Sequence, residues 1–141
     1  MKLVFKNKIP ILVSGTLMQF IGRLCGKKFG AVTLYPFIVV RDEQILNAED
    51  YIRHESIHLR QYEETLIIGL LIISIWEYYY ARLWLRKSKL DAYYYMAIEQ
   101  EAHQNDQDIN YLNNRKIFSY YKYIFTKNKK QIRQIAGKRI V

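Results

Sequence analysis

The segment His54-Glu55-Ser56-Ile57-His58 has the pattern H-E-x-x-H, which combines residue types able to bind a metal ion. On a helix that turns about 100° per residue, His54 and His58 lie about 40° apart on one face. Two imidazoles at this spacing can bind one zinc ion, each through a ring nitrogen at about 2.0–2.1 Å. Glu55 can then reach a water on the metal and act as a general base. The pattern predicts metal-assisted hydrolysis; the alternative is two surface histidines on an amphipathic helix.

Further polar residues at helical spacing could complete this site. Gln61 lies seven positions after His54, on the same face, where it can hydrogen-bond a ligand or line the cleft. On a later segment, Glu99 and His103 share a face, whereas Glu101 lies about 200° from Glu99. We expect Glu99 to be the third ligand, with Glu101 as the alternative. His103 can then hydrogen-bond a ligand and fix its orientation.

The elements that must position these residues are expected to be mostly helical. From Ala48 to beyond Leu85 the chain has no proline and only one glycine, which predicts one long helix or two abutting helices. Asn47 is the expected N-cap, with Asp50 as its capping-box partner. The other expected features are a bend over 84–93, a third helix over about 96–113 and a helical stripe over 116–125.

The stretch Ala31–Val40 (AVTLYPFIVV) is rich in β-branched and aromatic residues. Pro36 interrupts it, so we expect one or two strands at the edge of a sheet. The predicted fold class is therefore α+β and mostly α: a long H-E-x-x-H helix, a second glutamate-bearing helix and a small N-terminal strand or hairpin at Ala31–Val40. We expect a single compact domain over 1–114, followed by a basic C-terminal helix and tail over 115–141.

The positive charge of the chain is concentrated at its C-terminal end. Nine of the 22 Lys and Arg residues lie from Arg115 to Arg139, and residues 115–141 contain no Asp or Glu. The rest of the chain, 1–114, holds 13 basic and 13 acidic residues. The Arg115–Arg139 segment could therefore associate with an anionic membrane surface. Nucleic acid is not an expected partner, because such folds usually carry their basic residues on the folded face.

Cysteine content and two apolar stretches bear on location. Cys25 is the single cysteine, which excludes an intrachain disulfide and predicts a cytoplasmic protein. The apolar run 9–17 resembles a signal peptide only superficially, because no small-x-small cleavage site follows it. The stretch Leu66–Leu85 is long enough to cross a bilayer, but Glu77 and Arg82 oppose insertion. We expect a buried or interface-docked helix, with a transmembrane span as the alternative.

The motifs resemble those of a known family. The H-E-x-x-H segment followed by a glutamate in an E-x-x-A context (EQEA, 99–102) is similar to the gluzincin metallopeptidases. The stretches 35–40, 53–61 and 99–102 are closer still to small uncharacterised bacterial H-E-x-x-H proteins. This likeness covers roughly residues 30–111.

The resemblance implies a zinc-dependent peptidase. His54, His58 and Glu99 would bind Zn²⁺, and Glu55 would be the general base that activates a zinc-bound water against a peptide or protein substrate. Gluzincins often carry an aspartate four residues after the ligand glutamate, whereas this chain has His103 there. The group that stabilises the oxyanion is unassigned; its candidates are the tyrosines Tyr93, Tyr94 and Tyr95. The strand within 32–40 could bind an extended peptide along its edge.

Two other functions stay open at this point. Glu55-x-x-His58 is also the unit of di-iron carboxylate bundles, although the chain has no second Glu-x-x-His. A non-catalytic module is the other alternative, in which the basic tail docks on a membrane surface or nucleic acid and the metal site is incidental or structural.

Overall fold

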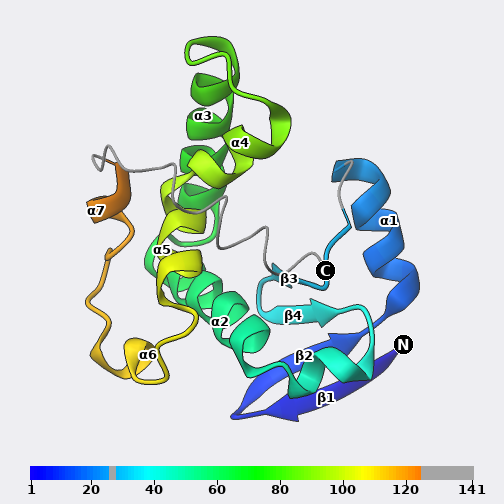
Figure 1. The fold of residues 1–141 in the computed structure, drawn as a ribbon. Helices are drawn as coiled ribbons and strands as arrows, with labels where there is room; N and C mark the ends of the chain where they lie inside the picture. The colour runs from blue at the N-terminus through cyan, green and yellow to red at the C-terminus, as the bar shows by residue number, and fades with distance from the viewer. Residues whose placement is uncertain (26–27, 125–141) are drawn as a thin grey trace. The chain divides into compact units, whose positions relative to one another are not determined.

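A computed structural model describes residues 1–25 and 28–124 of the chain. The chain divides into two compact units, Met1–Leu59 and Arg60–Val141, and the division falls within helix α2 (Glu49–Glu64). The first unit contains a four-stranded sheet, and the described part of the second unit is helical (Figure 1). This arrangement confirms the predicted fold class, α+β and mostly α.

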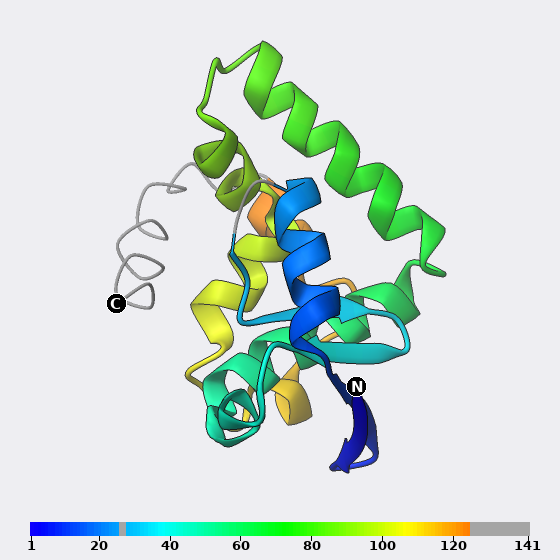
Figure 2. The same ribbon diagram turned by 90° about the vertical axis from the view of Figure 1, so that its right-hand side faces the viewer.

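The sheet of the first unit has the strand order β1-β2-β4-β3. Strands β1 and β2 are antiparallel, as are β3 and β4, whereas β2 and β4 are parallel. Helix α1 follows β2 directly and contacts β4 (Figure 2). The elements before α2 are β1 (Lys2–Lys6), β2 (Ile9–Val13), α1 (Gly15–Cys25), β3 (Ala31–Leu34), β4 (Phe37–Val40) and the 3-10 helix η1 (Glu43–Asn47).

The predicted strand or hairpin at Ala31–Val40 is confirmed as the β3–β4 hairpin, with Tyr35 and Pro36 in its turn. The β1–β2 hairpin was not predicted from the sequence. Asn7 and Lys8 form its two-residue turn, and both have positive φ (51° and 66°). A type I′ turn requires positive φ at both central residues, and its twist matches that of the two strands. Pro10 is tolerated in β2 because pairing with β4 begins only at the next residue.

The core of the first unit joins the sheet to η1 and α2 through buried aliphatic side chains: Ile11, Ala31, Ile38, Val40, Ile45, Ile52 and Leu59. The expected N-cap role of Asn47 is wrong. Asn47 ends η1, and α2 begins at Glu49 after Ala48. The capping side chain here is Asp42, which accepts a hydrogen bond from the Ile45 N–H (3.3 Å) and so starts the 3-10 turn instead.

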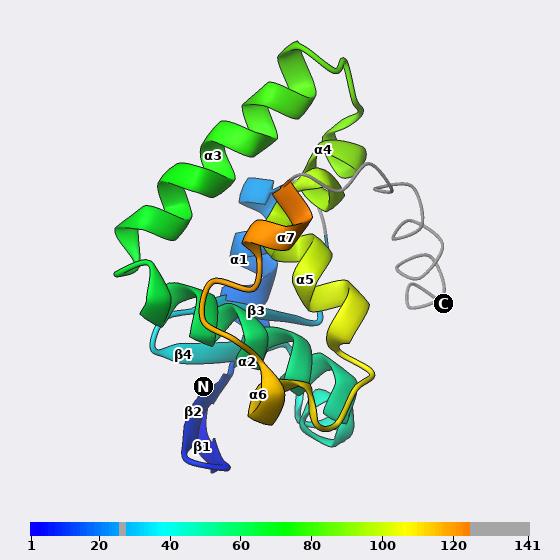
Figure 3. The same cartoon turned by 90° about the vertical axis from the view of Figure 1, so that its left-hand side faces the viewer.

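In the second unit, α5 is the central helix: its residues from 97 to 102 are all buried. Helix α4 returns along α3, and α7 lies beside α5 (Figure 3). Buried Leu70, Met96, Ile98 and Tyr120 form the core between them. The helices after α2 are α3 (Ile68–Leu83), α4 (Lys89–Tyr95), α5 (Ala97–Asn105), α6 (Tyr111–Asn114) and α7 (Tyr121–Ile124).

The structure resolves the choice between one long helix and two in favour of two. In the break between α2 and α3, Leu66 and Ile67 both have positive φ (52° and 67°). The β-branched Ile67 adopts this conformation only under strain. Within the described ranges, no single helix has both the length and the apolar composition to cross a membrane. Helices α2 and α3 are long and apolar enough only when they are counted together as one bent pair. This criterion considers length and composition alone.

Three expected boundaries are wrong. The bend expected over 84–93 ends at Ser88, because the Ser88 side chain accepts a hydrogen bond from the Asp91 N–H and starts α4 at Lys89. The helix expected over 96–113 stops at Asn105, and α6 is separate from it. Of the stripe expected over 116–125, only 121–124 is helical, because Phe118 has a positive φ (57°); residue 125 lies outside the described residues.

Candidate metal centre

The two histidines of the H-E-x-x-H segment lie side by side on α2. Their ring centroids are 4.9 Å apart with the ring planes nearly perpendicular, at 82°. His54 is 8% exposed and His58 7%, so the alternative of two solvent-facing histidines is wrong. A buried pair of imidazoles on one helix face is the arrangement that a metal site uses.

Glu55 is held by the sheet of the first unit. The hydroxyl of Thr33, on β3, donates a hydrogen bond to Glu55 Oε2 (2.6 Å). The same hydroxyl lies within donating distance of the Glu55 backbone carbonyl oxygen (3.0 Å). Both residues are buried. Thr33 was not among the predicted site residues, although its place in the strand that precedes the H-E-x-x-H helix was visible. It fixes the direction of the carboxylate, as a positioned general base requires.

Strand β3 is an edge strand, as expected for the stretch that contains it. Arg41 N–H donates to the Gly30 carbonyl (2.9 Å), so alternation along the antiparallel ladder makes Val32 and Leu34 the residues that hydrogen-bond β4. The backbone N–H and C=O of Thr33 therefore point toward the outer edge of the sheet. One residue thus combines a backbone directed to the edge with a side chain bonded to Glu55.

Replacing Thr33 with valine should cost about 1–3 kcal/mol in free energy of unfolding, because the buried Glu55 carboxylate loses its hydroxyl donor while the strand keeps a β-branched residue. Urea denaturation followed by circular dichroism measures this loss. Thr33→Ser is the matched control, since it keeps the hydroxyl. Equal stability of the wild type and Thr33→Val would show that the Thr33–Glu55 bond does not hold the carboxylate.

Glu99 and His103 meet on α5 in the second unit, as their i, i+4 spacing predicts. His103 Nε2 lies 3.5 Å from Glu99 Oε2, and His103 Nδ1 lies 3.9 Å from Asp106 Oδ2. The ring of Tyr94, one of the three tyrosines considered for the oxyanion, packs against His103 with centroids 5.3 Å apart. Sequence reasoning missed Asp106, whose spacing of seven from Glu99 places it on the same helix face.

The carboxylate of Glu101 is fully engaged elsewhere in the second unit. Its Oε1 accepts from Tyr111 Oη (2.8 Å) and Arg115 Nε (2.6 Å), and its Oε2 accepts from Gln61 Nε2 (2.9 Å) and the Arg115 guanidinium (3.2 Å). Gln61 Nε2 also donates to the backbone carbonyl of Ile98 (3.2 Å). Gln61 thus joins the last turns of α2 to α5, and Glu101 serves as the acceptor of a buried network.

Arg115 is the cation of this network. Its guanidinium also donates to both oxygens of Glu64, at 3.1 Å for Oε2, and the Phe118 N–H donates to Glu64 Oε2 (2.9 Å). Burial opposes the charge on Arg115, but its hydrogen bonds to Glu64 and Glu101 outweigh burial and raise its pKa above the usual value. Burial and the nearby Glu101 charge likewise raise the pKa of Tyr111. The first residue of the basic segment is therefore part of a buried, charged core.

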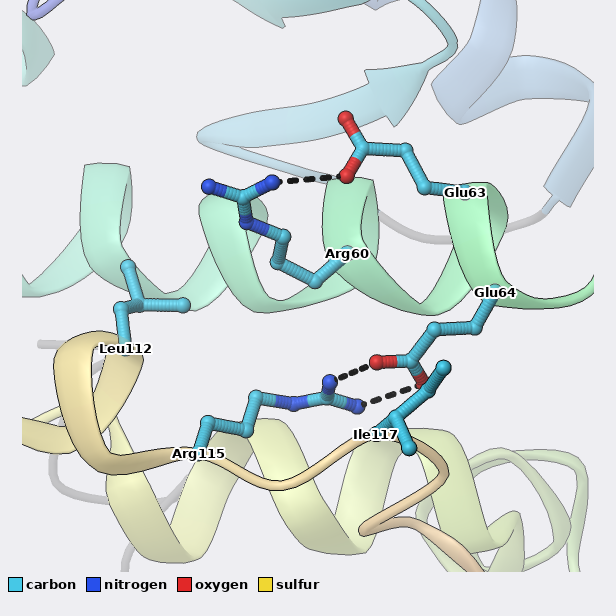
Figure 4. A pocket seen from close by; sticks show the side chains of 6 residues that line it. All are labelled: Arg60, Glu63, Glu64, Leu112, Arg115 and Ile117. Atoms are coloured by element: carbon cyan, nitrogen blue, oxygen red, sulfur yellow. Dashed lines mark hydrogen bonds and ion pairs between the residues drawn. The ribbon is translucent and has the colours of Figure 1, made fainter.

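A surface pocket of about 430 Å³ lies beside this network (Figure 4). It is lined by Arg60, Glu63, Glu64, Leu112, Arg115 and Ile117. Its charges are paired within it: Arg60 donates to Glu63 (2.8 Å), and Glu64 turns its carboxylate to the Arg115 guanidinium. None of the lining residues is a predicted site residue, and the pocket supplies no group for the predicted chemistry.

The described residues that could hold a metal ion are His54 and His58 in the first unit and Glu99, His103 and Asp106 in the second. Four of the five are buried, and His103 is nearly so. Imidazole nitrogens and carboxylate oxygens are ligands of zinc and of other divalent transition metals. The donor set is therefore chemically suited to a metal ion.

Comparison with known proteins identifies no relative of this chain: no family model, no curated protein and no solved structure matches it.

Proposed function

We propose that the chain is a zinc-dependent, gluzincin-like metallopeptidase in which His54, His58 and Glu99 bind one Zn²⁺ ion and Glu55 is the general base. The buried pair of imidazoles on one face of α2 is the observation that carries this proposal. Two histidines and one carboxylate are a ligand set of catalytic zinc sites, which keep a further position open for water or substrate.

The choice of Glu99 over Glu101 follows from what each carboxylate already binds. Glu101 is 0% exposed and accepts hydrogen bonds from three side chains, so both of its oxygens are used. Glu99 lies instead beside His103, which can orient it.

Helix geometry also supports Glu99 as the third ligand. Gln61 lies only about 20° from His54 around α2, and it donates to the carbonyl of Ile98, the residue before Glu99. Both histidines and Gln61 therefore share one face of α2 by helix periodicity. This relation favours a ligand from α5 at the position of Glu99.

The proposed reaction is hydrolysis of a peptide bond by water. Bound zinc would supply Lewis acidity, which polarises a carbonyl and lowers the pKa of water. Glu55, directed by Thr33, accepts a proton from the attacking water and delivers it to the leaving amine. The proposed place for an extended peptide substrate is the edge strand β3, where it would add a strand to the sheet.

Two matched variants test the ligand assignment. Glu99→Gln should lower zinc affinity by more than about a hundredfold, because it removes a ligand rather than a neighbour of one. Glu101→Gln makes the same chemical change two residues away and should leave one zinc per chain, measured on protein that circular dichroism shows to be folded. Metal content after dialysis and competition with a zinc chelator measure both. Equal zinc affinity of the two variants would contradict the proposal, and two bound irons per chain would favour a di-iron site.

A further inference from the structure

Helix α3 turns its only carboxylate inward. Glu77 is 2% exposed, and its Oε2 accepts a hydrogen bond from the backbone N–H of Ala97 (2.9 Å), the first residue of α5. The N-cap residue of α5 makes no side-chain hydrogen bond. The backbone N–H groups in the first turn of a helix have no acceptor within the helix, and Glu77 supplies one of them with an acceptor. The polar side of α3 therefore faces the interior of the second unit.

The opposite side of α3 is apolar and exposed. Its large side chains recur at helical spacing and each is between 47% and 68% exposed; they are Ile68, Leu71, Ile72, Ile75, Trp76 and Tyr79, the α3 outer face. Leu83 (65%) and Trp84 (73%) extend the row beyond the last turn. The largest apolar patch of a typical soluble monomer covers about 300–600 Å² and often has a function. A continuous row along 16 residues marks α3 as an interaction surface.

The charged residues that follow α3 in the sequence are positive. Glu77 is the only acidic residue between 65 and 90, and it is buried. Arg86 and Lys89, just after the helix, are both exposed. The next acidic residue, Asp91, accepts a hydrogen bond from the Ser88 hydroxyl (2.6 Å). An apolar, tryptophan-rich face with cations at one end is the pattern of helices that lie in the interface of an anionic membrane.

We propose that the α3 outer face inserts into the interfacial layer of a bilayer that contains anionic lipid, with the helix axis parallel to the membrane plane. Sixteen residues give a helix of about 24 Å, shorter than the roughly 30 Å hydrocarbon core, so α3 lies on the bilayer and does not cross it. Trp76, Tyr79 and Trp84 take the headgroup level, where such rings are enriched. Arg86 and Lys89 pair with lipid phosphates. This inference is independent of the metal site.

Intrinsic fluorescence tests the proposal directly, because Trp76 and Trp84 are the only tryptophans of the chain. Adding vesicles of phosphatidylcholine and phosphatidylglycerol in equal amounts to the full-length protein should shift the emission to shorter wavelength. Lipids brominated on their acyl chains should quench both tryptophans, since an interfacial helix buries its apolar face about 5–10 Å deep. Cosedimentation with vesicles but no change in tryptophan emission would mean that the C-terminal basic segment binds the membrane and α3 does not.

Substitutions separate the apolar and charged contributions. Ile72→Ser and Ile75→Ser should each weaken vesicle binding at least about tenfold, because each removes several buried methylene equivalents. Arg86→Gln and Lys89→Gln should each weaken it about fivefold, and only for anionic vesicles. Phe5→Ser is the matched control: Phe5 is 68% exposed, on β1 in the other unit, and its loss should not change binding. Circular dichroism checks that each variant is folded.

A second copy of the chain is the competing occupant of this surface. Light scattering over a range of protein concentrations would then show a dimer that Ile72→Ser dissociates, together with no tryptophan response to vesicles. That result would overturn the proposal. A monomer whose tryptophan emission shifts with anionic vesicles, and does so less in Ile72→Ser, would support it.

Discussion

Glu55→Gln should abolish peptide hydrolysis while the protein keeps its metal. The amide has nearly the same shape as the carboxylate and can still interact with Thr33, but it cannot accept a proton from water. Loss of a general base lowers the rate by about 10²- to 10⁴-fold. The measurement is kcat/KM on a quenched fluorescent peptide library with zinc-loaded protein, together with zinc content per chain.

The matched control for this variant is Glu63→Gln, which makes the same change on the same helix at an exposed position. It should leave both hydrolysis and zinc content unchanged. Full activity of Glu55→Gln would show that another group is the base. A zinc-loaded wild type that cleaves no peptide in the library would rule out general peptidase activity and direct attention to other substrates.

Arg115→Ala should lower the free energy of unfolding by about 3–5 kcal/mol, because it leaves the buried carboxylates of Glu64 and Glu101 without their cation. Urea denaturation measures the change. Lys116→Ala, at the exposed neighbouring position, should stay within about 0.5 kcal/mol of the wild type. Arg115→Lys should fall between the two, since it keeps the charge but cannot donate to two carboxylates as the guanidinium does. A loss below about 1 kcal/mol in Arg115→Ala would mean that water compensates the carboxylates.

Local patterns predicted the parts of the fold that depend on short-range periodicity. The helix that carries His54 and His58 and the strands on either side of Pro36 follow from spacing and side-chain shape within about ten residues. The β1–β2 hairpin was missed because the apolar run 9–17 was weighed only as a signal peptide and not as a strand. Helix ends were misplaced where the capping side chain was not the expected one, as with Ser88, or where the cap comes from a distant helix, as with Glu77 and α5.

In the candidate site too, pairs within one helix could be predicted, whereas contacts between distant segments could not. The His54–His58 pair and the Glu99–His103 pair follow from helix geometry alone, and both are found. The partner of Glu55 could not be predicted, because Thr33 lies 22 residues away and meets it only through the packing of β3 on α2. Composition likewise assigned Arg115 to the basic C-terminal helix and tail over 115–141. A list of charges does not distinguish an arginine in water from one enclosed by two carboxylates.

The burial of Arg115 has a consequence for proteolytic trimming. A protease that removed the lysine-rich end after residue 124 would leave the enclosed guanidinium and the buried Tyr120 in place. Cleavage after Asn114, only ten residues earlier, would strip two interior carboxylates of their counter-ion and leave an aromatic-sized gap beside Leu70 and Ile98. Trimming at these two points should therefore have very different effects on stability, although the charged residues that either cut removes are all basic.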